Sequence, residues 1–253
     1  MGSEAFNLQG KVAIVTGANT GLGQAMALAL AKAGASIALV GRSAPDDTQA
    51  QIRSIGGNSA SINADLSDSG NVSRVVEETR VALGAVDILV NNAGIIKRND
   101  ALDFTVEDWD SVMATNLKVP FFLAQAAARS MVAAGRGGKI INVASLLSFQ
   151  GGIRVASYTA SKSGLAGITR LLANEWAGKG INVNAIVPGY FKTNNTEALR
   201  ADPQRNREIL QRIPAGRWGD PAELGGAAVF LASSAADYIH GALIPVDGGW
   251  LGR

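Results

Sequence analysis

The stretch that decides the fold lies near the beginning of the chain and reads Val12-Ala13-Ile14-Val15-Thr16-Gly17-Ala18-Asn19-Thr20-Gly21-Leu22-Gly23. Its four aliphatic residues predict a buried strand, and the glycines after them predict a tight turn into a helix. Gly17, Gly21 and Gly23 allow the backbone to approach a pyrophosphate, whose negative charge is favoured by the free N–H groups at a helix start. Glycine triplets also occur in ordinary turns, but the strand before this one and the helix after it favour a dinucleotide-binding site.

Similar aliphatic runs recur along the chain, with helical patterns between them. Because these runs are apolar throughout, they predict a parallel sheet covered by helices on both faces. The expected strands are 12–15, 37–40, 88–90, 139–143, 181–187 and 243–246, with a further strand before Asp65. The expected helices are 21–33, 70–83, 106–134, 157–178 and 221–233, with Thr105 and Pro221 at two helix starts. This order predicts an α/β fold, a single doubly wound Rossmann-type domain over residues 1–253 with a mostly parallel sheet.

The composition excludes several classes of chemistry. The 253 residues include no cysteine and one histidine, so disulfides and thiolate nucleophiles are excluded and no metal site is expected. We expect the single histidine, His240, to pack or to lie in an interface. A net charge of +2 with dispersed Lys and Arg indicates no nucleic-acid or membrane partner. Met1–Gln9 has no leader or myristoylation pattern, and no run approaches the ~18 apolar residues that span a membrane. A cytoplasmic location is therefore expected.

The end of the second expected strand bears on the choice between NAD and NADP. Many NAD-binding proteins place a carboxylate there for the ribose hydroxyls, but this chain has Gly41 followed by Arg42 and Ser43. Without a carboxylate nothing repels a 2′-phosphate, and Arg42 can pair with it bidentately, although Arg42 can equally be solvated. Further along, Asp65 can accept from the adenine amine, and Asn91–Gly94 closes the fourth strand where the cofactor should pass.

Three residues form the strongest candidate for catalysis. Tyr158 and Lys162 are four apart at the start of an expected helix, so they share one face, and the ammonium can favour the phenolate. That makes Tyr158 a plausible general acid/base. Tyr and Lys occur at this spacing in many helices by chance. Ser145 adds weight to the pair, because it ends the fifth strand at the expected cofactor edge, where its hydroxyl can hold a substrate oxygen.

Over nearly its whole length the chain resembles the classical short-chain dehydrogenase/reductase family. The resemblance rests on TGxxxGxG up to Gly23, NNAG at 91–94, Ser145, YxxxK at 158–162, and Pro188-Gly189 with Thr193. It implies that Asn116 completes a catalytic tetrad and holds a water that relays protons through Lys162. It also implies that Thr193 and the backbone after Pro188-Gly189 orient the nicotinamide carboxamide. The residues expected to bind the cofactor are Gly17, Asn19, Thr20, Gly21, Leu22, Gly23, Arg42, Ser43, Asp65, Leu66, Asn92, Ala93, Gly94, Tyr158, Lys162, Pro188, Gly189 and Thr193.

A narrower resemblance is to the 2-dehydro-3-deoxy-D-gluconate 5-dehydrogenases, also described as 2-deoxy-D-gluconate 3-dehydrogenases. It rests on Ile96-Lys97-Arg98 with Asp100-Ala101-Leu102, and on the segments 147–154, 193–196 and 212–218. The resemblance implies a sugar-acid substrate. It also implies NAD, which opposes the indication from Arg42, so both NAD and NADP stay open.

A sugar acid carries a carboxylate, which a cation and neutral donors would recognise. Arg154 is the first candidate because it lies near Ser145 and Tyr158 in the sequence. Gln150, Arg98 and Asn194 come next, although each of these side chains can equally be structural or solvated. The segment 193–217 has no clear strand and follows a late strand, so it is expected to form a substrate lid.

Two other functions compete with the sugar-acid dehydrogenase. A reductase of the same fold could act on another carbonyl, such as a 3-oxoacyl thioester, and would be indifferent to Arg154. A catalytically idle dinucleotide-sensing scaffold would have no need of the complete Asn116, Ser145, Tyr158 and Lys162 set. By resemblance a homotetramer is expected, and the Ala-rich faces at 121–128 and 164–173 are compatible with close helix contact, though equally with a core.

Overall fold

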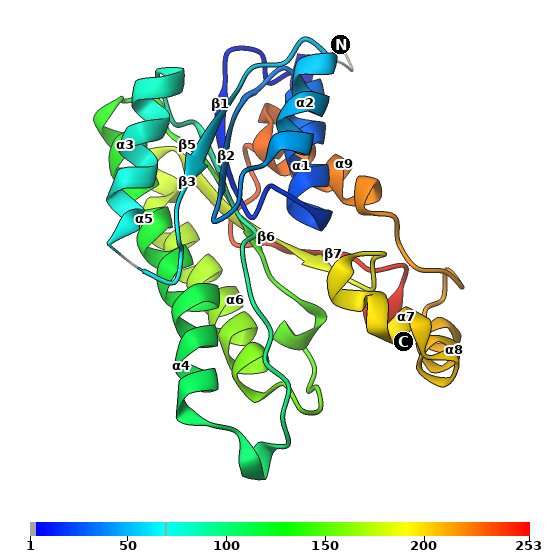
Figure 1. Ribbon diagram of the computed structural model, residues 1–253. Helices are drawn as coiled ribbons and strands as arrows, with labels where there is room; N and C mark the ends of the chain where they lie inside the picture. Colours follow the sequence, from blue (N-terminus) through cyan, green and yellow to red (C-terminus); the bar gives the residue numbers. More distant parts are fainter. Residues whose placement is uncertain (1–3, 69) are drawn as a thin grey trace.

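Seven parallel strands form one sheet in the order β3-β2-β1-β4-β5-β6-β7 (Figure 1). The computed structural model describes residues 4–68 and 70–253, so the expectation about Met1–Gln9 lies partly outside the described residues. The strands are β1 (Val12–Thr16), β2 (Ser36–Gly41), β3 (Ser59–Asn63), β4 (Ile88–Asn91), β5 (Gly138–Val143), β6 (Ile181–Pro188) and β7 (Leu243–Val246). The strand order reverses between β1 and β4, and doubly wound sheets bind ligands in the crevice at that point.

Helices cover both faces of the sheet, which confirms the predicted doubly wound fold (Figure 1). On one face α1 (Gly21–Lys32), α2 (Asp46–Ser54) and α9 (Gly225–Ala232) enclose a buried cluster that includes Met26, Ile52 and Leu231. On the other face lie α3 (Asn71–Leu83), α5 (Val119–Ala133) and α6 (Ala156–Trp176). The expected all-apolar strands are confirmed in the sheet centre, because β1, β4 and β6 are buried along their whole length.

The β3 edge of the sheet holds the elements that the sequence pattern predicts least well. The expected helices do not include α2, in which only Thr48 and Ile52 are buried, so its sequence has no apolar period. The bounds of β3 are not predicted either. Only Ile62 is buried in that strand, because an edge strand is covered less completely than a central one.

The helix expected over 106–134 contains a change of helix type. It consists of α4 (Val106–Met113), the π turn η3 (Ala114–Lys118) and α5. The predicted cap is confirmed, because the Thr105 hydroxyl accepts a hydrogen bond of 3.1 Å from the Asp108 backbone N–H. Pro221 likewise opens a first turn, η7 (Pro221–Leu224), which leads into α9.

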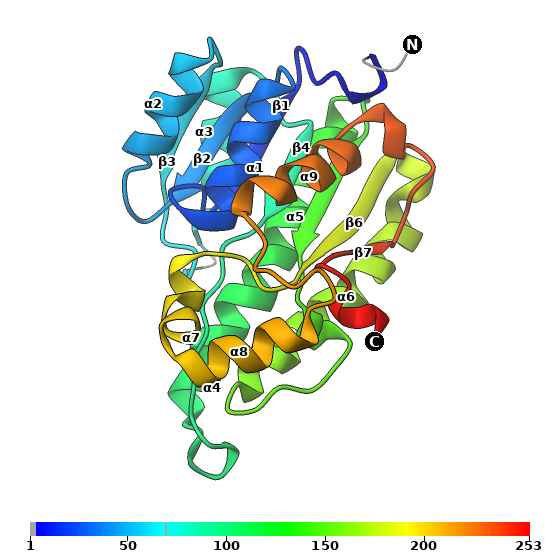
Figure 2. The ribbon, with the colours of Figure 1, turned by 90° about the vertical axis from the view of Figure 1, so that its right-hand side faces the viewer.

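Two helices lie beyond the carboxyl ends of the strands, within the segment 193–217. The sequence pattern predicts this segment as a lid but does not predict its helices. They are α7 (Glu197–Ala201) and α8 (Pro203–Arg212), and Figure 2 shows them crossing below the sheet. The α8 residue Ile209 and the following Ile213 pack in a third cluster with Trp218 and Trp250. The short turns are η1 (Glu4–Phe6), η2 (Ala101–Asp103), η4 (Leu146–Ser148), η5 (Ala177–Lys179), η6 (Asn194–Thr196), η8 (Ser234–Ala236) and η9 (Trp250–Gly252).

Within residues 4–68 and 70–253, no helix combines the length and the apolar character needed to cross a membrane.

Among the described glycines, Gly23 is the one where an added Cβ would come nearest to another atom. A substitution there tests how closely α1 packs against the sheet. A Cβ at Gly23 would overlap the carbonyl oxygen of Gly17 and the side-chain nitrogen of Asn92. We expect Gly23→Ala to lower the free energy of unfolding by roughly 2 to 3 kcal/mol, because α1 must move away from the sheet. Urea unfolding followed by circular dichroism measures this change.

Gly226→Ala is the matched control, because Gly226 lies in α9 and a Cβ there meets no atom within 4 Å in the described residues. It should raise stability by about 0.5 to 1 kcal/mol. Equal effects of the two substitutions would contradict the tight packing at Gly23.

Candidate functional site

The first loop leaves the N-terminus of α1 open to an anion. Thr20 is the N-cap, and no side chain among the described residues caps the free N–H groups. Gly17 and Gly21 have φ angles of +65° and +58°, which suit glycine and turn the chain sharply into the helix. The first helical turn also contains no acidic residue. These features fit the pyrophosphate of a dinucleotide, which these N–H groups would hold.

Side chains from β1 and β4 tie the two sides of the crevice together. The Thr16 hydroxyl accepts hydrogen bonds from the backbone N–H groups of Asn92 (3.0 Å) and Ala93 (2.9 Å). In return, the Asn92 amide donates to the backbone oxygens of Thr16 (2.9 Å) and Gly17 (3.3 Å). Leu22 packs behind the loop against the core, so the loop is held from both sides.

The residues expected around the adenosine lie together at the end of β2. The Asn19 amide donates to the Ser43 hydroxyl at 2.8 Å, and Arg42 is exposed beside them. Asp65 accepts hydrogen bonds from the backbone N–H and the hydroxyl of Ser67, and these bonds hold its pKa below the ordinary value, with a smaller contribution from the charge of Arg42. Leu66, by contrast, is buried in the core, so only its backbone is available to a ligand.

Asn116 lies in the π turn η3, fully buried. Its side chain accepts from the Ile95 backbone N–H at 2.9 Å and donates to the Ile95 carbonyl at 2.8 Å. A Cβ at Gly94 would lie 3.2 Å from the Asn116 side-chain oxygen, so the loop after β4 passes directly over Asn116. Asn116 therefore holds this loop through its side chain.

Ser145, Tyr158 and Lys162 come from two adjacent elements. Ser145 is the N-cap of η4, directly beyond β5, and its hydroxyl oxygen accepts from the Leu147 backbone N–H at 3.2 Å. Lys162 is buried within α6, and its ammonium donates to the Val143 carbonyl at 2.6 Å. The Lys162 nitrogen lies 5.7 Å from the centre of the Tyr158 ring. In the described part of the chain, no carboxylate pairs with Lys162.

Burial determines the electrostatics of this group. It raises the pKa of the Tyr158 phenol above the ordinary value, while the nearby Ser145 hydroxyl and the charge of Arg98 lower it. Burial also lowers the pKa of Lys162 from 10.5 to about 8. The sequence predicts Lys162 as the cation that favours the phenolate. In the structure Lys162 donates to the Val143 carbonyl and lies beside the Tyr158 ring, and the charge of Arg98 acts on the phenol in addition.

Pro188, Gly189 and Thr193 border the other side of the crevice. The Gly189 N–H donates to the Val246 carbonyl at 2.9 Å, and a Cβ on Gly189 would overlap Asp247, so β6 and β7 stay close there. A Cβ on Gly21 would lie 3.6 Å from the Thr193 methyl group. The glycine loop and Thr193, which border the expected cofactor site on its two sides, are therefore adjacent.

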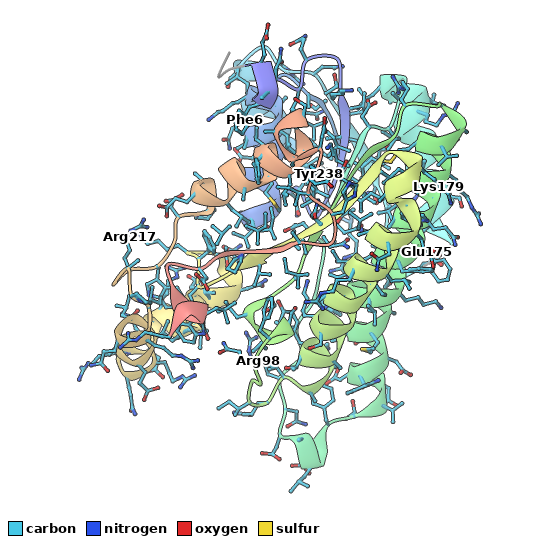
Figure 3. The ribbon with its side chains drawn as sticks, turned by 180° about the vertical axis from the view of Figure 1, so that it is seen from behind. Phe6, Arg98, Glu175, Lys179, Arg217 and Tyr238 are labelled. Carbon is cyan, nitrogen blue, oxygen red and sulfur yellow. The ribbon has the colours of Figure 1, made fainter. Side chains whose placement is uncertain are left out.

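The four candidates for substrate recognition divide into two groups. Arg98 acts on Tyr158 through its charge, and Figure 3 shows it near the start of α6, opposite the end that carries Glu175 and Lys179. Gln150 accepts a hydrogen bond of 2.9 Å from Arg212. Arg154 and Asn194 are exposed, and in the described residues no hydrogen bond links their side chains to the catalytic candidates. Arg154 does adopt a φ of +62°, which non-glycine residues rarely do and which often marks functional loops.

Two residues of the site are not among the sequence-based candidates. Thr16 belongs to the quoted glycine motif, but its role appears only when β4 lies beside β1 and brings Asn92 to it. Arg212 belongs to one of the segments that carry the narrower resemblance, yet its partners Gln150 and Trp250 are far away in the sequence. Its place in the segment 212–218, which carries the narrower resemblance, is the sequence signal that could have indicated Arg212.

Comparison with solved structures supports the same arrangement. A crystal structure with bound NADP from Agrobacterium tumefaciens, assigned as a 2-deoxy-D-gluconate 3-dehydrogenase, is 58% identical with a TM-score of 0.94, over 98% of this chain and 99% of its own. A gluconate 5-dehydrogenase from Burkholderia cenocepacia, in complex with NADP and tartrate, is 37% identical with a TM-score of 0.94 over the whole of both chains.

Sequence comparison agrees. The 2-dehydro-3-deoxy-D-gluconate 5-dehydrogenase of Escherichia coli (strain K12) is 59% identical over 249 residues, which are 98% of each chain. Residues 17–251 match the family model described as enoyl-(acyl carrier protein) reductase. With the glycine loop, the NNAG turn and the Ser145, Tyr158 and Lys162 group in place, the chain belongs to the short-chain dehydrogenase/reductase family.

Proposed function

We propose that this protein is an NAD(P)-dependent dehydrogenase that transfers hydride between a nicotinamide and a hydroxyl or keto group of a deoxy sugar acid. The substrate class is 2-dehydro-3-deoxy-D-gluconate or 2-deoxy-D-gluconate, as the names of its relatives indicate. The observation that carries the proposal is the meeting of Ser145, Tyr158 and Lys162 at the carboxyl edge of the sheet, beside an anion-binding helix start. A bound NAD or NADP supplies or accepts the hydride.

In the direction of oxidation, Tyr158 as phenolate takes the proton of the substrate hydroxyl, and in reduction it returns that proton. The Ser145 oxygen accepts from Leu147, and its O–H, which lies toward Tyr158 in the structure, would donate to the substrate oxygen when the substrate lies between them. Lys162 uses one of its three donors on Val143 and keeps two for the phenolate and the cofactor ribose. Arg98 stabilises the phenolate through its positive charge.

The surroundings of the cofactor site support NADP as well as NAD. Gly41 puts no carboxylate at the end of β2, where many NAD-binding proteins have one, and the two solved relatives contain NADP. The segment 193–217 remains the proposed substrate lid, and Ile209 in its helix α8 packs into the third cluster. A single domain and a cytoplasmic location stay predictions.

The proposed reaction is tested by following nicotinamide absorbance with both sugar acids and both cofactors. Tyr158→Phe should lower kcat by roughly 100- to 10,000-fold, because the phenol can no longer exchange a proton. Cofactor binding, measured by fluorescence, should persist. Tyr238→Phe makes the same chemical change at a fully exposed side chain and should leave turnover unchanged.

Other results would replace the proposal. Turnover of 3-oxoacyl thioesters alone would establish the acyl reductase instead. Cofactor binding without turnover of any carbonyl would favour the dinucleotide-sensing scaffold, and full activity of Tyr158→Phe would remove Tyr158 from the mechanism.

The buried ammonium of Lys162 should reduce stability at neutral pH. Its pKa in the folded protein is about 8, against 10.5 for an ordinary lysine, so below pH 8 the folded state carries a desolvated charge. That cost, about 3 kcal/mol, disappears as the pH rises from 8 to 10.5, because the folded state loses its proton first. Lys162→Met should therefore abolish turnover yet unfold at higher urea concentration than the wild type at pH 7. The difference should shrink between pH 8 and 10, and a difference independent of pH would contradict this account.

We infer a homotetramer from two exposed apolar surfaces. A groove of about 510 Å³ runs between α5 and α6 and is lined by Phe121, Ala128, Leu171 and Trp176, among others. Glu175 and Lys179 stand at its edge, on the outer side of α6 (Figure 3). The edge strand β7 is likewise only partly covered. Small residues in α5 and α6 allow close approach of a second copy.

Light scattering should give the mass of four chains for the wild type. Leu171→Asp should yield smaller assemblies, because it places a charge in the apolar groove. Val81→Asp changes a more exposed residue of α3 and should leave the mass unaltered. A monomeric wild type would contradict the tetramer.

A further inference from the structure

A hydrogen bond crosses from the end of α8 to the loop that follows Ser145. The guanidinium of Arg212, the last residue of α8, donates to the side-chain oxygen of Gln150 at 2.9 Å. Gln150 in turn is anchored by its backbone N–H, which donates to the Leu146 carbonyl at 3.2 Å. The bond thus joins the proposed lid segment to the wall of the site that carries Ser145.

This bond determines which way round the Gln150 amide lies. Arginine has donors and no acceptor, so only the oxygen of the amide can face Arg212. The NH2 group of Gln150 must then point elsewhere, and it has no acceptor among residues 4–68 and 70–253. Gln150 is therefore a donor without a protein partner, close to the expected position of a substrate rich in oxygen atoms.

The Arg212 guanidinium is itself held in place by the aromatic residues beneath it. It stacks on Trp250, 4.1 Å from the ring centre, and Trp250 is buried against Tyr190 with ring centres 4.7 Å apart. Asp247 fixes the turn before Trp250 by accepting from the backbone N–H groups of Gly249 (2.8 Å) and Leu251 (2.9 Å). Stacking keeps the planar fork in one orientation, which a lysine could not provide.

The end of α8 that carries Arg212 is also attached firmly. The Trp218 indole donates to the Asn206 side chain at 2.7 Å, and Ile209 and Ile213 are buried on the same side. Arg212 therefore lies on a fixed part of the segment 193–217. A chain of contacts leads from Tyr190, next to Pro188-Gly189, through Trp250 and Arg212 to Gln150.

We propose that Arg212 is a positioning residue that orients the Gln150 amide so that its NH2 group donates to an oxygen of the bound sugar acid. This inference rests on the proposed function. Gln150 is then the residue that contacts the substrate, and Arg212 acts only through it. Trp250 supports Arg212 from below, so the C-terminal turn contributes to substrate selection without reaching the substrate.

Two substitutions at Gln150 separate this role from a purely structural bridge. Gln150→Glu keeps an acceptor for Arg212 but removes the donor, whereas Gln150→Met removes both. We expect each to raise KM for the sugar acid roughly tenfold or more, with kcat changed much less. If only Gln150→Met raised KM, the bridge alone would matter. If only Gln150→Glu did, charge repulsion would explain it, and either result would overturn the proposal.

A double-mutant cycle then tests whether Arg212 acts through Gln150. Arg212→Met keeps an apolar stem over Trp250 and should raise KM several-fold in the wild type, but not further in the Gln150→Met background. Arg207→Met, the same change at an exposed position of α8, is the control and should leave KM unaltered. Additive effects of Arg212→Met and Gln150→Met would show that Arg212 works independently and would overturn its positioning role.

This experiment gives different results if the proposed function is wrong and if only the role of Gln150 is wrong. No turnover of either sugar acid by the wild type would remove the proposed function and this inference with it. Wild-type turnover with an unchanged KM in both Gln150 variants would remove the inference alone. Thermal unfolding of each variant shows whether it is folded, so a loss caused by misfolding is recognised directly.

Discussion

The tie between Thr16 and Asn92 is the interaction on which the rest of the site depends. It joins the ends of β1 and β4, the two strands between which the sheet order reverses. At such a point the loops on either side diverge and leave a crevice, which is useful only if its walls keep a constant separation. Four hydrogen bonds of Thr16 and Asn92 fix that separation. Because Gly23 has no side chain, α1 can also pack closely against these two residues.

The proposed catalytic group of Ser145, Tyr158 and Lys162 shows what this organisation costs in stability. A buried ammonium without a carboxylate partner in the described residues is an unfavourable element of a fold, as is a desolvated phenol. For Lys162, the hydrogen bond to the Val143 carbonyl at the end of β5 compensates for part of this cost. Proteins commonly retain such unfavourable groups where chemistry requires them.

The sequence predicts this molecule well where a short local pattern determines the structure. The buried strands, the glycine loop and the Thr105 cap follow from neighbouring residues, and the structure confirms them. The pattern fails at α2 and β3, whose residues are mostly exposed. It also fails for Arg212 and for the effect of Arg98 on Tyr158, because both depend on segments that only the tertiary fold brings together. Spacing along one helix brings Lys162 to Tyr158, but it cannot indicate that Arg98, from another segment, also lies near the phenol.

The π turn at Asn116 has a consequence for how this chain can change in length. A π turn accommodates one residue more than an α-helical turn. Deleting one residue between Ala114 and Lys118 would restore a regular α-helix and leave α4 and α5 on nearly the same faces. It would, however, remove the turn that brings the Asn116 side chain to the Ile95 backbone. The number of residues in this turn therefore determines where Asn116 lies, independently of which amino acids surround it.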